Sequence, residues 1–279
     1  MKTFTIEHNL ETNKSSIKKS YLEYCMMNCL GKQKSFLFKE RFYKLKKNEQ
    51  EKFNEMVRAL KSSIPVAYVL GNQPFFNYTF KVNNNVLIPR SETEIMVSHI
   101  LNCGDKIYKQ SGNVTVLDLG AGSGCIGLTI AAERKNWNVI LTEKFYSCAD
   151  TIRENMSILK VNNCYFIIMD WLSGLKNNLA DIIVSNPPYI EHQSILIDDN
   201  VKNFEPNTAL FSGEKGLSDI KKIIKSSQET LKENGYLFLE NGYDQSDEVV
   251  NLLREHDYRD IQVLMDYNNI HRFTCSRKI

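Results

Sequence analysis

Four residues at 186–189 join polar and rigid side chains at the end of an apolar run. The run covers residues 181–185 and predicts a buried strand, and the residues after it are Asn186, Pro187, Pro188 and Tyr189. The prolines lack N–H groups and fix φ, so the backbone there cannot continue a sheet and its carbonyls are left for another partner. An Asn oxygen, a backbone carbonyl and a flat Tyr ring could hold a planar NH2 group. This hook, residues 186–189, therefore suggests a substrate amino or amide nitrogen.

A glycine-rich loop follows a second apolar run, at 114–119, and precedes an expected helix at about 125–133. Glycines allow a tight turn and close approach of a ligand, and a helix N-terminus presents unpaired N–H groups to a negative group. A third run, 138–143, ends in Glu143, where an acid commonly binds ribose hydroxyls. The pattern indicates a nucleoside-cofactor site at the C-terminal edge of a parallel sheet. The loop consists of Gly120, Ala121, Gly122, Ser123 and Gly124.

The glycine spacing alone does not identify the cofactor. Gly122, Gly124 and Gly127 also fit a dinucleotide fingerprint, and a tight turn without a ligand is the simpler reading. The rest of the chain distinguishes a dinucleotide site from another nucleoside-cofactor site. A further strand is expected at 165–171. In a nicotinamide-dependent oxidoreductase the hook would have no role. Successive strand ends carry four polar side chains: Asp118, Glu143, Asp170 and Asn186.

This order of strand ends resembles class I S-adenosylmethionine-dependent methyltransferases. Five segments narrow the resemblance to the release-factor glutamine N5-methyltransferase family, from about residue 64 to the end: 64–71, 86–94, 204–210, 216–220 and 266–269. Departures are local: Ser91, Asn203 and Lys215 replace residues usual in that family. The resemblance implies an α/β, Rossmann-like sheet that is mostly parallel with an antiparallel C-terminal edge strand. From this resemblance, together with the residue patterns described below, we expect a helical N-terminal docking domain at 1–72, a β-hairpin linker at 73–91 and a methyltransferase domain at 92–279.

The resemblance implies that the enzyme methylates the glutamine of the Gly-Gly-Gln loop of peptide-chain release factors. It assigns 120–124 to the methionine and ribose of S-adenosylmethionine, Glu143 to the ribose hydroxyls, and Asp170 with Trp171 to the adenine. Asn186, Pro187 and Tyr189 are the implied catalytic residues. The whole hook would bind the substrate, and Asn186 would also contact the cofactor.

Simpler structural roles stay open for several of these residues. Trp171 could be a core aromatic, and Asp170 could cap a helix. Asp118 could bond loop N–H groups instead of a ligand. Glu205 and Glu240 match the family pattern, but an ion pair at the rim would also explain them.

A different target, an exocyclic amine of adenine or guanine in nucleic acid, would suit the same hook. Such an enzyme should need a positively charged channel. Residues 1–72 carry 14 Lys or Arg against 7 Asp or Glu, whereas the rest carries 21 against 26. The catalytic part is thus net negative, which counts against nucleic acid.

The basic amino-terminal part reads as a small helical domain. Apolar residues recur at helical spacing near 21–30 and 53–60, and a further apolar series at 36–45 includes Phe38 and Phe42. A Lys-rich exterior can be merely solvated, but the opposite charge of the two parts favours docking of a protein or ribonucleoprotein partner. Between the two parts, Asn83 to Asn85 predict the turn of a hairpin with strands at 75–82 and 86–88.

Composition argues against a membrane protein, a secreted disulfide-linked protein and a metal-binding protein. No run approaches the ~18 apolar residues of a membrane span, and no signal peptide is recognisable, so we expect a cytoplasmic protein. Seven cysteines without a C-x-x-C pair fit buried thiols better than disulfides. Cys125, inside the glycine loop region, reads as a packing residue. The five histidines show no metal-ligand spacing, so no metal is predicted.

Overall fold

The computed structural model describes residues 4–194 and 197–279. The chain divides into two compact units, one with the chain up to Asn72 and Asp199–Phe204, the other with Gln73–Asp198 and Glu205–Ile279. None of the helices in the described ranges is long and apolar enough to cross a membrane.

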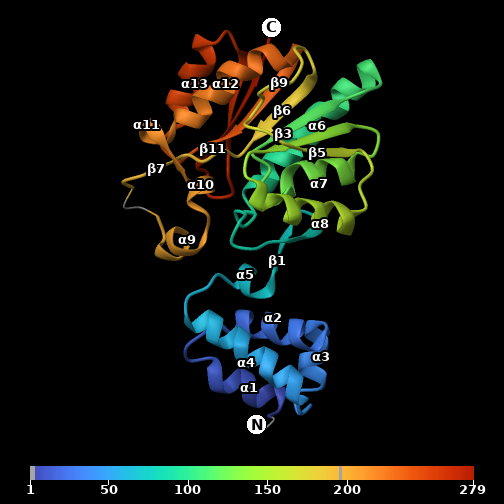
Figure 1. Ribbon diagram of the computed structural model, residues 1–279, viewed down its shortest axis with the longest axis vertical. Helices are drawn as coiled ribbons and strands as arrows, with labels where there is room; N and C mark the ends of the chain where they lie inside the picture. The colour runs from blue at the N-terminus through green and yellow to red at the C-terminus, as the bar shows by residue number, and fades with distance from the viewer. Residues whose placement is uncertain (1–3, 195–196) are drawn as a thin grey trace. The chain divides into compact units, whose positions relative to one another are not determined.

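The amino-terminal unit is helical, and its core is built from apolar residues of α2 and α4 (Figure 1). Cys25 and Met26 of α2 and Phe53 of α4 are fully buried, as the helical spacing predicted. The apolar series at 36–45 was partly misread, because Phe38 and Phe42 are 61% and 63% exposed. Its helices are α1 (Ile6–Asn13), α2 (Lys19–Leu30), α3 (Lys34–Lys39), α4 (Lys47–Lys61), α5 (Val66–Leu70) and α9 (Asp199–Phe204).

The second unit is built on a seven-stranded sheet with the order β10-β11-β9-β6-β3-β4-β5. The pairs among β5, β4, β3, β6 and β9 are parallel, and β11 is antiparallel to both of its neighbours. The predicted α/β class is confirmed, with one correction: the antiparallel C-terminal strand lies one place inside the edge, which β10 forms. The strands are β3 (Thr115–Leu119), β4 (Asn138–Glu143), β5 (Cys164–Ile168), β6 (Ala180–Ser185), β9 (Leu231–Glu240), β10 (Arg259–Met265) and β11 (His271–Arg277).

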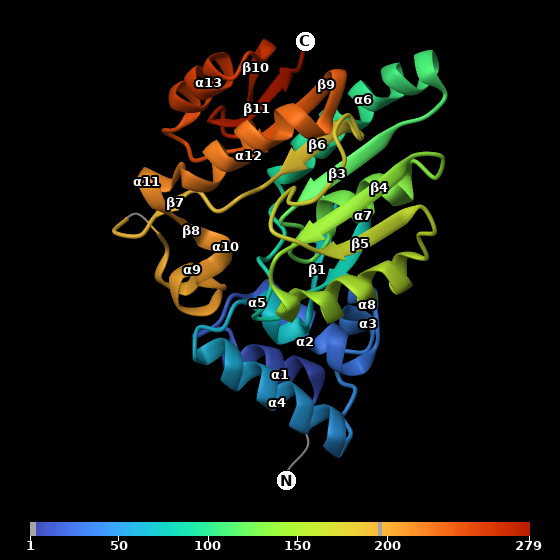
Figure 2. The same cartoon turned by 45° about the horizontal axis from the view of Figure 1, so that its top comes forward.

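Helices cover both faces of this sheet (Figures 1 and 2). On one face lie α6 (Thr93–Ser111), α7 (Cys125–Glu133) and α8 (Ala149–Leu159), which follows the short 3-10 helix Tyr146–Cys148. On the other lie α12 (Ser218–Thr230) and α13 (Ser246–Glu255). Between β6 and α12 the chain forms β7 (Ile190–Glu191), α10 (Asn207–Leu210), β8 (Phe211–Ser212) and α11 (Gly213–Gly216), and β7 pairs with β8.

The two central strands are buried along their whole length, because helices cover both of their faces. In register, Leu119 of β3 lies beside Thr142 of β4 and beside Ser185 of β6. The carboxyl ends of the three strands therefore meet at one edge of the sheet. The glycine loop, Glu143 and the hook all begin there, at the point where the strand order reverses.

A hairpin precedes the sheet, but its position differs from the prediction. It joins β1 (Asn72–Phe75) to β2 (Tyr78–Lys81), and the predicted strand at 86–88 does not form. Asn83 does form a turn, accepting the N–H of Asn85 at 2.9 Å. Residues 87–90 belong to no strand, and the N–H of Ile88 donates to the Glu205 side chain at 3.1 Å.

Candidate active site

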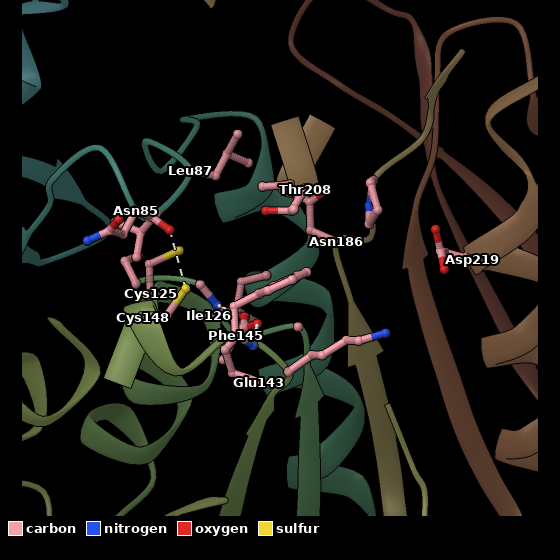
Figure 3. Close-up of a pocket in the computed structure, with 18 of the residues that line it drawn as sticks. Asn85, Leu87, Cys125, Ile126, Glu143, Phe145, Cys148, Asn186, Thr208 and Asp219 are labelled. Carbon is pink, nitrogen blue, oxygen red and sulfur yellow. Dashed lines mark hydrogen bonds between the residues drawn. The ribbon is translucent and has the colours of Figure 1, made fainter. Parts of the chain in front are cut away.

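A cavity of about 300 Å³ opens at the carboxyl edge of the sheet (Figure 3). Its walls come from segments that are distant in sequence: the chain before α6, the glycine loop, the ends of β4 and β5, the hook, and residues 208–222. Asn186 and Thr208 lie across from Glu143 and Phe145 in the close-up. Such a volume is at the lower end of the range for small-molecule sites.

The glycine loop forms the floor of the cavity through four of its residues, 120–123. The N–H groups of Gly120 and Ala121 both donate to the Thr142 carbonyl, at 2.9 and 3.0 Å, which ties the loop to β4. Gly120 has φ +67°, and a Cβ there would lie 2.9 Å from the Trp171 ring. Only glycine fits this position, because a side chain would strain the backbone and collide with the indole. The Ser123 hydroxyl is buried and has no hydrogen-bond partner among the described residues.

Glu143 braces the loop from the end of β4. One carboxylate oxygen accepts the Gly122 N–H at 3.0 Å, and the other accepts the Phe145 N–H at 2.9 Å. The residue is only 6% exposed, and it lines the cavity. Each carboxylate oxygen can accept more than one hydrogen bond, so acceptor capacity remains on the cavity side. This arrangement fits a pair of ribose hydroxyls.

Asp170 and Trp171 line the cavity beside Glu143. Asp170 pairs with Lys144 at 2.9 Å, and this hydrogen bond raises the pKa of the lysine amine. Trp171 has φ +51°, which is rare for an aromatic residue, and it packs against the core as well as on Gly120. Trp171 is therefore both a packing residue and a wall of the site. No helix-capping hydrogen bond from the Asp170 side chain occurs in the described part of the chain.

Asp118 does not line the cavity. Its carboxylate lies beneath the loop, 1% exposed, and accepts the Gly127 N–H at 2.8 Å. Burial raises the pKa of this carboxyl to about 7; the Gly127 hydrogen bond acts in the opposite direction, and the charge of Glu143 adds to the rise. Asp118 therefore has the structural role that the sequence left open, a hydrogen bond to a backbone N–H near the loop.

The hook continues from β6 and presents Asn186 and Pro188 to the cavity. Asn186 is half-buried, and none of the residues in the described ranges hydrogen-bonds its carboxamide. Pro187 is buried beside it and, like Tyr189, does not belong to the described lining of the cavity. Asn186 thus offers an unpaired amide oxygen on the wall opposite Glu143.

Tyr189 anchors the far end of the hook. Its hydroxyl donates to Glu240 at 3.1 Å, and its carbonyl accepts from the Gln245 side chain at 2.9 Å. Glu240 is 2% exposed and also accepts from Thr93 at 2.7 Å. Burial raises the pKa of Glu240, while the hydrogen bonds from Thr93 and Tyr189 lower it. The stacking role of Tyr189 stays a prediction. The sequence did not settle the roles of Glu205 and Glu240. Glu205 forms an ion pair with Arg90, and Glu240 connects Tyr189 of the hook to Thr93 of α6.

Several cavity residues were not identified from the sequence. Arg90, Thr93 and Phe145 line the cavity, as do Thr208 and Phe211 from the segment after the hook. Phe145 could have been suspected from the sequence, because it lies two residues after the predicted site residue Glu143. The others come from segments distant in sequence, including the first residue of α6, α10 and β8, and their approach to the cavity depends on tertiary folding. In the described ranges, no group of His, Cys, Asp and Glu side chains could hold a metal ion.

Comparisons with known proteins agree with this geometry. The chain matches the PrmC N-terminal domain family over residues 5–71 and the Methyltransferase small domain family over residues 92–204. Proteins named release factor glutamine methyltransferase from Francisella tularensis and Shewanella oneidensis are 35% and 32% identical to it. Both comparisons cover 91% of this chain, and they cover 88% and 87% of the relatives.

Solved structures share the fold at low identity. A ribosomal protein L11 methylase from Lactobacillus delbrueckii gives a TM-score of 0.51 at 16% identity, over 74% of this chain and 90% of its own. A methyltransferase from Pyrococcus furiosus gives 0.50 at 15% identity, over 81% of this chain and 97% of its own.

Proposed function

Because the chain belongs to the release factor glutamine methyltransferase family, we propose that it methylates the side-chain amide nitrogen of the glutamine in the Gly-Gly-Gln motif of peptide-chain release factors. S-adenosylmethionine is the cofactor. The observation that carries the proposal is the Asn186 carboxamide, which faces the same cavity as Glu143 and has no partner within the described ranges.

The cofactor side of the cavity has the groups that a nucleoside requires. Glu143 offers spare acceptor capacity for two ribose hydroxyls, and Gly120 leaves the backbone open to close approach. The orphaned Ser123 hydroxyl would gain a partner when the cavity is filled, which removes the cost of a buried unsatisfied group. When bound, the cofactor supplies an electrophilic methyl group on a positively charged sulfur.

The hook must compensate for the weak nucleophilicity of an amide nitrogen, whose lone pair is delocalised into the carbonyl. The Asn186 side-chain oxygen accepts one N–H of the substrate amide. In this proposal the other N–H is accepted by the backbone carbonyl of Pro187, a buried residue next to Asn186 that is not in the described lining. This orientation directs the nitrogen lone pair at the methyl carbon, and the two acceptors stabilise positive charge as it develops on nitrogen. S-adenosylmethionine would supply the methyl group and keep the bonding electrons of its sulfur–methyl bond, and one proton of the methylated amide would then leave to water. No protein base is needed before attack, because the alkylated nitrogen is strongly acidic.

The basic helical unit supplies the docking surface for the release factor in this proposal. Phe38 and Phe42 are exposed, and each lies beneath a cation: Lys34 at 6.0 Å and Arg41 at 4.6 Å from the ring centre. We call these four residues the aromatic-basic surface. Exposed aromatic rings with arginine are typical of protein interfaces. The net positive charge of residues 1–72 would also speed encounter with an acidic partner.

The test is methylation of a purified release factor, followed by peptide mass spectrometry to locate the methyl group. Wild-type enzyme should modify the glutamine of the Gly-Gly-Gln loop. Asn186→Ala should lower kcat by about 100-fold, the effect typical of removing one transition-state hydrogen bond. Asn251→Ala, at an exposed position on α13, is the matched control and should keep wild-type activity. An unmodified release factor would refute the function, and full activity of Asn186→Ala would refute the role of the hook.

A further inference from the structure

Arg90 is one of the three Lys or Arg side chains in the described lining of the cavity, which Asn186 and Pro188 of the hook also line. The Arg90 side chain is 34% exposed. Its charge acts on both Tyr189 and Glu240: burial raises the pKa of each, and Arg90 is among the groups that lower it. Arg90 therefore shares the cavity with the hook, and its charge reaches the residues that anchor the hook.

Glu205 holds Arg90 in place. One oxygen of its carboxylate binds the guanidinium at 2.6 Å, and the other accepts the Ile88 N–H at 3.1 Å. The Glu205 side chain is only 2% exposed. This single acid fixes both the guanidinium and the backbone before it, and it joins two segments 115 residues apart. Bound in this way, the guanidinium has a set orientation toward the cavity.

The guanidinium keeps donors that no described residue uses. It has five N–H groups in a planar fork, and Glu205 is its one hydrogen-bond acceptor among the residues of the described ranges. Because the side chain lines the cavity, remaining N–H groups are available to a bound molecule. They require an acceptor oxygen on that molecule.

The charge of the cavity wall indicates whether the acceptor for Arg90 is a charged phosphate oxygen or an uncharged carbonyl oxygen. Three Lys or Arg side chains belong to the described lining, and each is paired with a carboxylate. Arg90 pairs with Glu205, Lys144 with Asp170 at 2.9 Å, and Lys222 with Asp219 at 3.1 Å. Glu143 adds a further negative charge without a cation partner in the described part. A phosphate backbone would find no uncompensated positive charge here, whereas a peptide carbonyl needs a donor but no net charge.

We propose that Arg90, oriented by Glu205, is a substrate-binding residue that donates to a backbone carbonyl of the uncharged peptide segment bearing the target glutamine. This inference rests on the proposed function and adds the contact that selects a peptide over a nucleic acid. The bond is made to a part of the substrate that does not react, so it forms equally before and during methyl transfer. Its loss should raise KM and leave kcat unchanged.

The test compares three variants of the full chain by steady-state methylation of a release factor. Arg90→Lys keeps a positive charge beside Glu205 and removes the fork. The double variant Arg90→Met/Glu205→Gln removes both charges without burying an unpaired one, and it retains an acceptor for the Ile88 N–H. Arg134→Lys is the matched control, because Arg134 pairs with Asp105 at 2.7 Å and neither residue lines the cavity.

Both Arg90 variants should raise KM for the release factor by about 10- to 100-fold, the range expected for a hydrogen bond to a charged donor. Their kcat and their affinity for S-adenosylmethionine, measured by calorimetry, should equal those of Arg134→Lys. A KM equal to that of the control would overturn the inference while wild-type activity still upheld the function. Methylation of an adenine-containing oligonucleotide by wild-type enzyme would overturn the choice of a peptide. If wild-type enzyme left the release factor unmodified, both proposals would fall.

Discussion

Glu143 shapes the cavity in which we propose that it binds the cofactor. Its two oxygens already accept N–H groups on either side of β4's end, so the carboxylate shapes the glycine loop before any ligand arrives. The sequence predicted the ligand role from the position of the acid after a strand. It did not reveal the bracing role, because hydrogen bonds to backbone N–H groups leave no pattern in the residue types.

Asp118 should make the stability of the protein depend on pH. Its folded pKa of about 7 lies above the ordinary value of 3.8, so the folded state binds an extra proton between these values. Stability contributed by this group is present below pH 4 and is lost as pH rises through 7. Asp118→Asn should therefore lose less stability between pH 5 and pH 8 than wild type does, by about 2 to 3 kcal/mol. Urea denaturation at the two pH values measures this.

Asp181→Asn is the control for that measurement. Asp181 is also buried and accepts a backbone N–H, from Thr115 at 2.8 Å, but it has a cation partner in Lys232 at 2.8 Å. Its variant leaves Asp118 in place and should keep the wild-type fall in stability. Equal pH profiles for wild type and Asp118→Asn would show that Asp118 does not carry the effect.

At the scale of elements, α7 depends on the absence of a side chain at Gly127. A Cβ there would lie 2.2 Å from the Leu141 side chain and 2.9 Å from the Asp118 carboxylate. Gly127→Ala should lower the free energy of unfolding by about 1 to 3 kcal/mol, since overpacking outweighs the better helix propensity of alanine. Gly213→Ala is the control, because its nearest neighbour would be at 3.7 Å. Thermal denaturation that ranks the two variants equally would mean that α7 can shift away from the sheet.

The strands of the sheet were the most predictable elements. Strands buried on both faces have continuous apolar sequences, so β3 and β6 were recognisable, and the polar residues at their ends marked the site. The hairpin was misplaced because its turn uses Phe76, with φ +55°, which no turn preference indicates. Arg90 and Thr208 reach the cavity only through contacts between distant segments, and such contacts are invisible to local patterns.

For the whole molecule, the net positive charge of residues 1–72 lies outside the unit that holds the cavity. The aromatic-basic surface lies in the basic unit, where Lys34 pairs with Glu23 at 2.8 Å and Arg41 with Glu7 at 3.7 Å. The cations of the cavity wall, in the other unit, are also paired with carboxylates. Phe38→Ala/Phe42→Ala should raise KM for the release factor by about tenfold, as expected for interface aromatics, without changing cofactor affinity. Methylation kinetics and calorimetry measure the two quantities.

Tyr165→Ala provides the comparison for this surface. Tyr165 is 59% exposed, on the edge strand β5 of the other unit, so its removal deletes an exposed ring outside the aromatic-basic surface. An equal KM for the two variants would refute docking through Phe38 and Phe42. A change in melting temperature confined to the double variant would attribute its effect to folding instead.

The two acceptors proposed at the hook, the Asn186 side-chain oxygen and the Pro187 carbonyl, together require two N–H groups on the substrate amide. An unmodified carboxamide satisfies both acceptors, but a carboxamide that has gained one methyl retains a single N–H and must leave one acceptor unmet. The modified side chain is then held less firmly than the original, and its remaining lone pair is no longer aligned. Such a site would release the glutamine side chain after one methyl transfer and would not add a second methyl group to it.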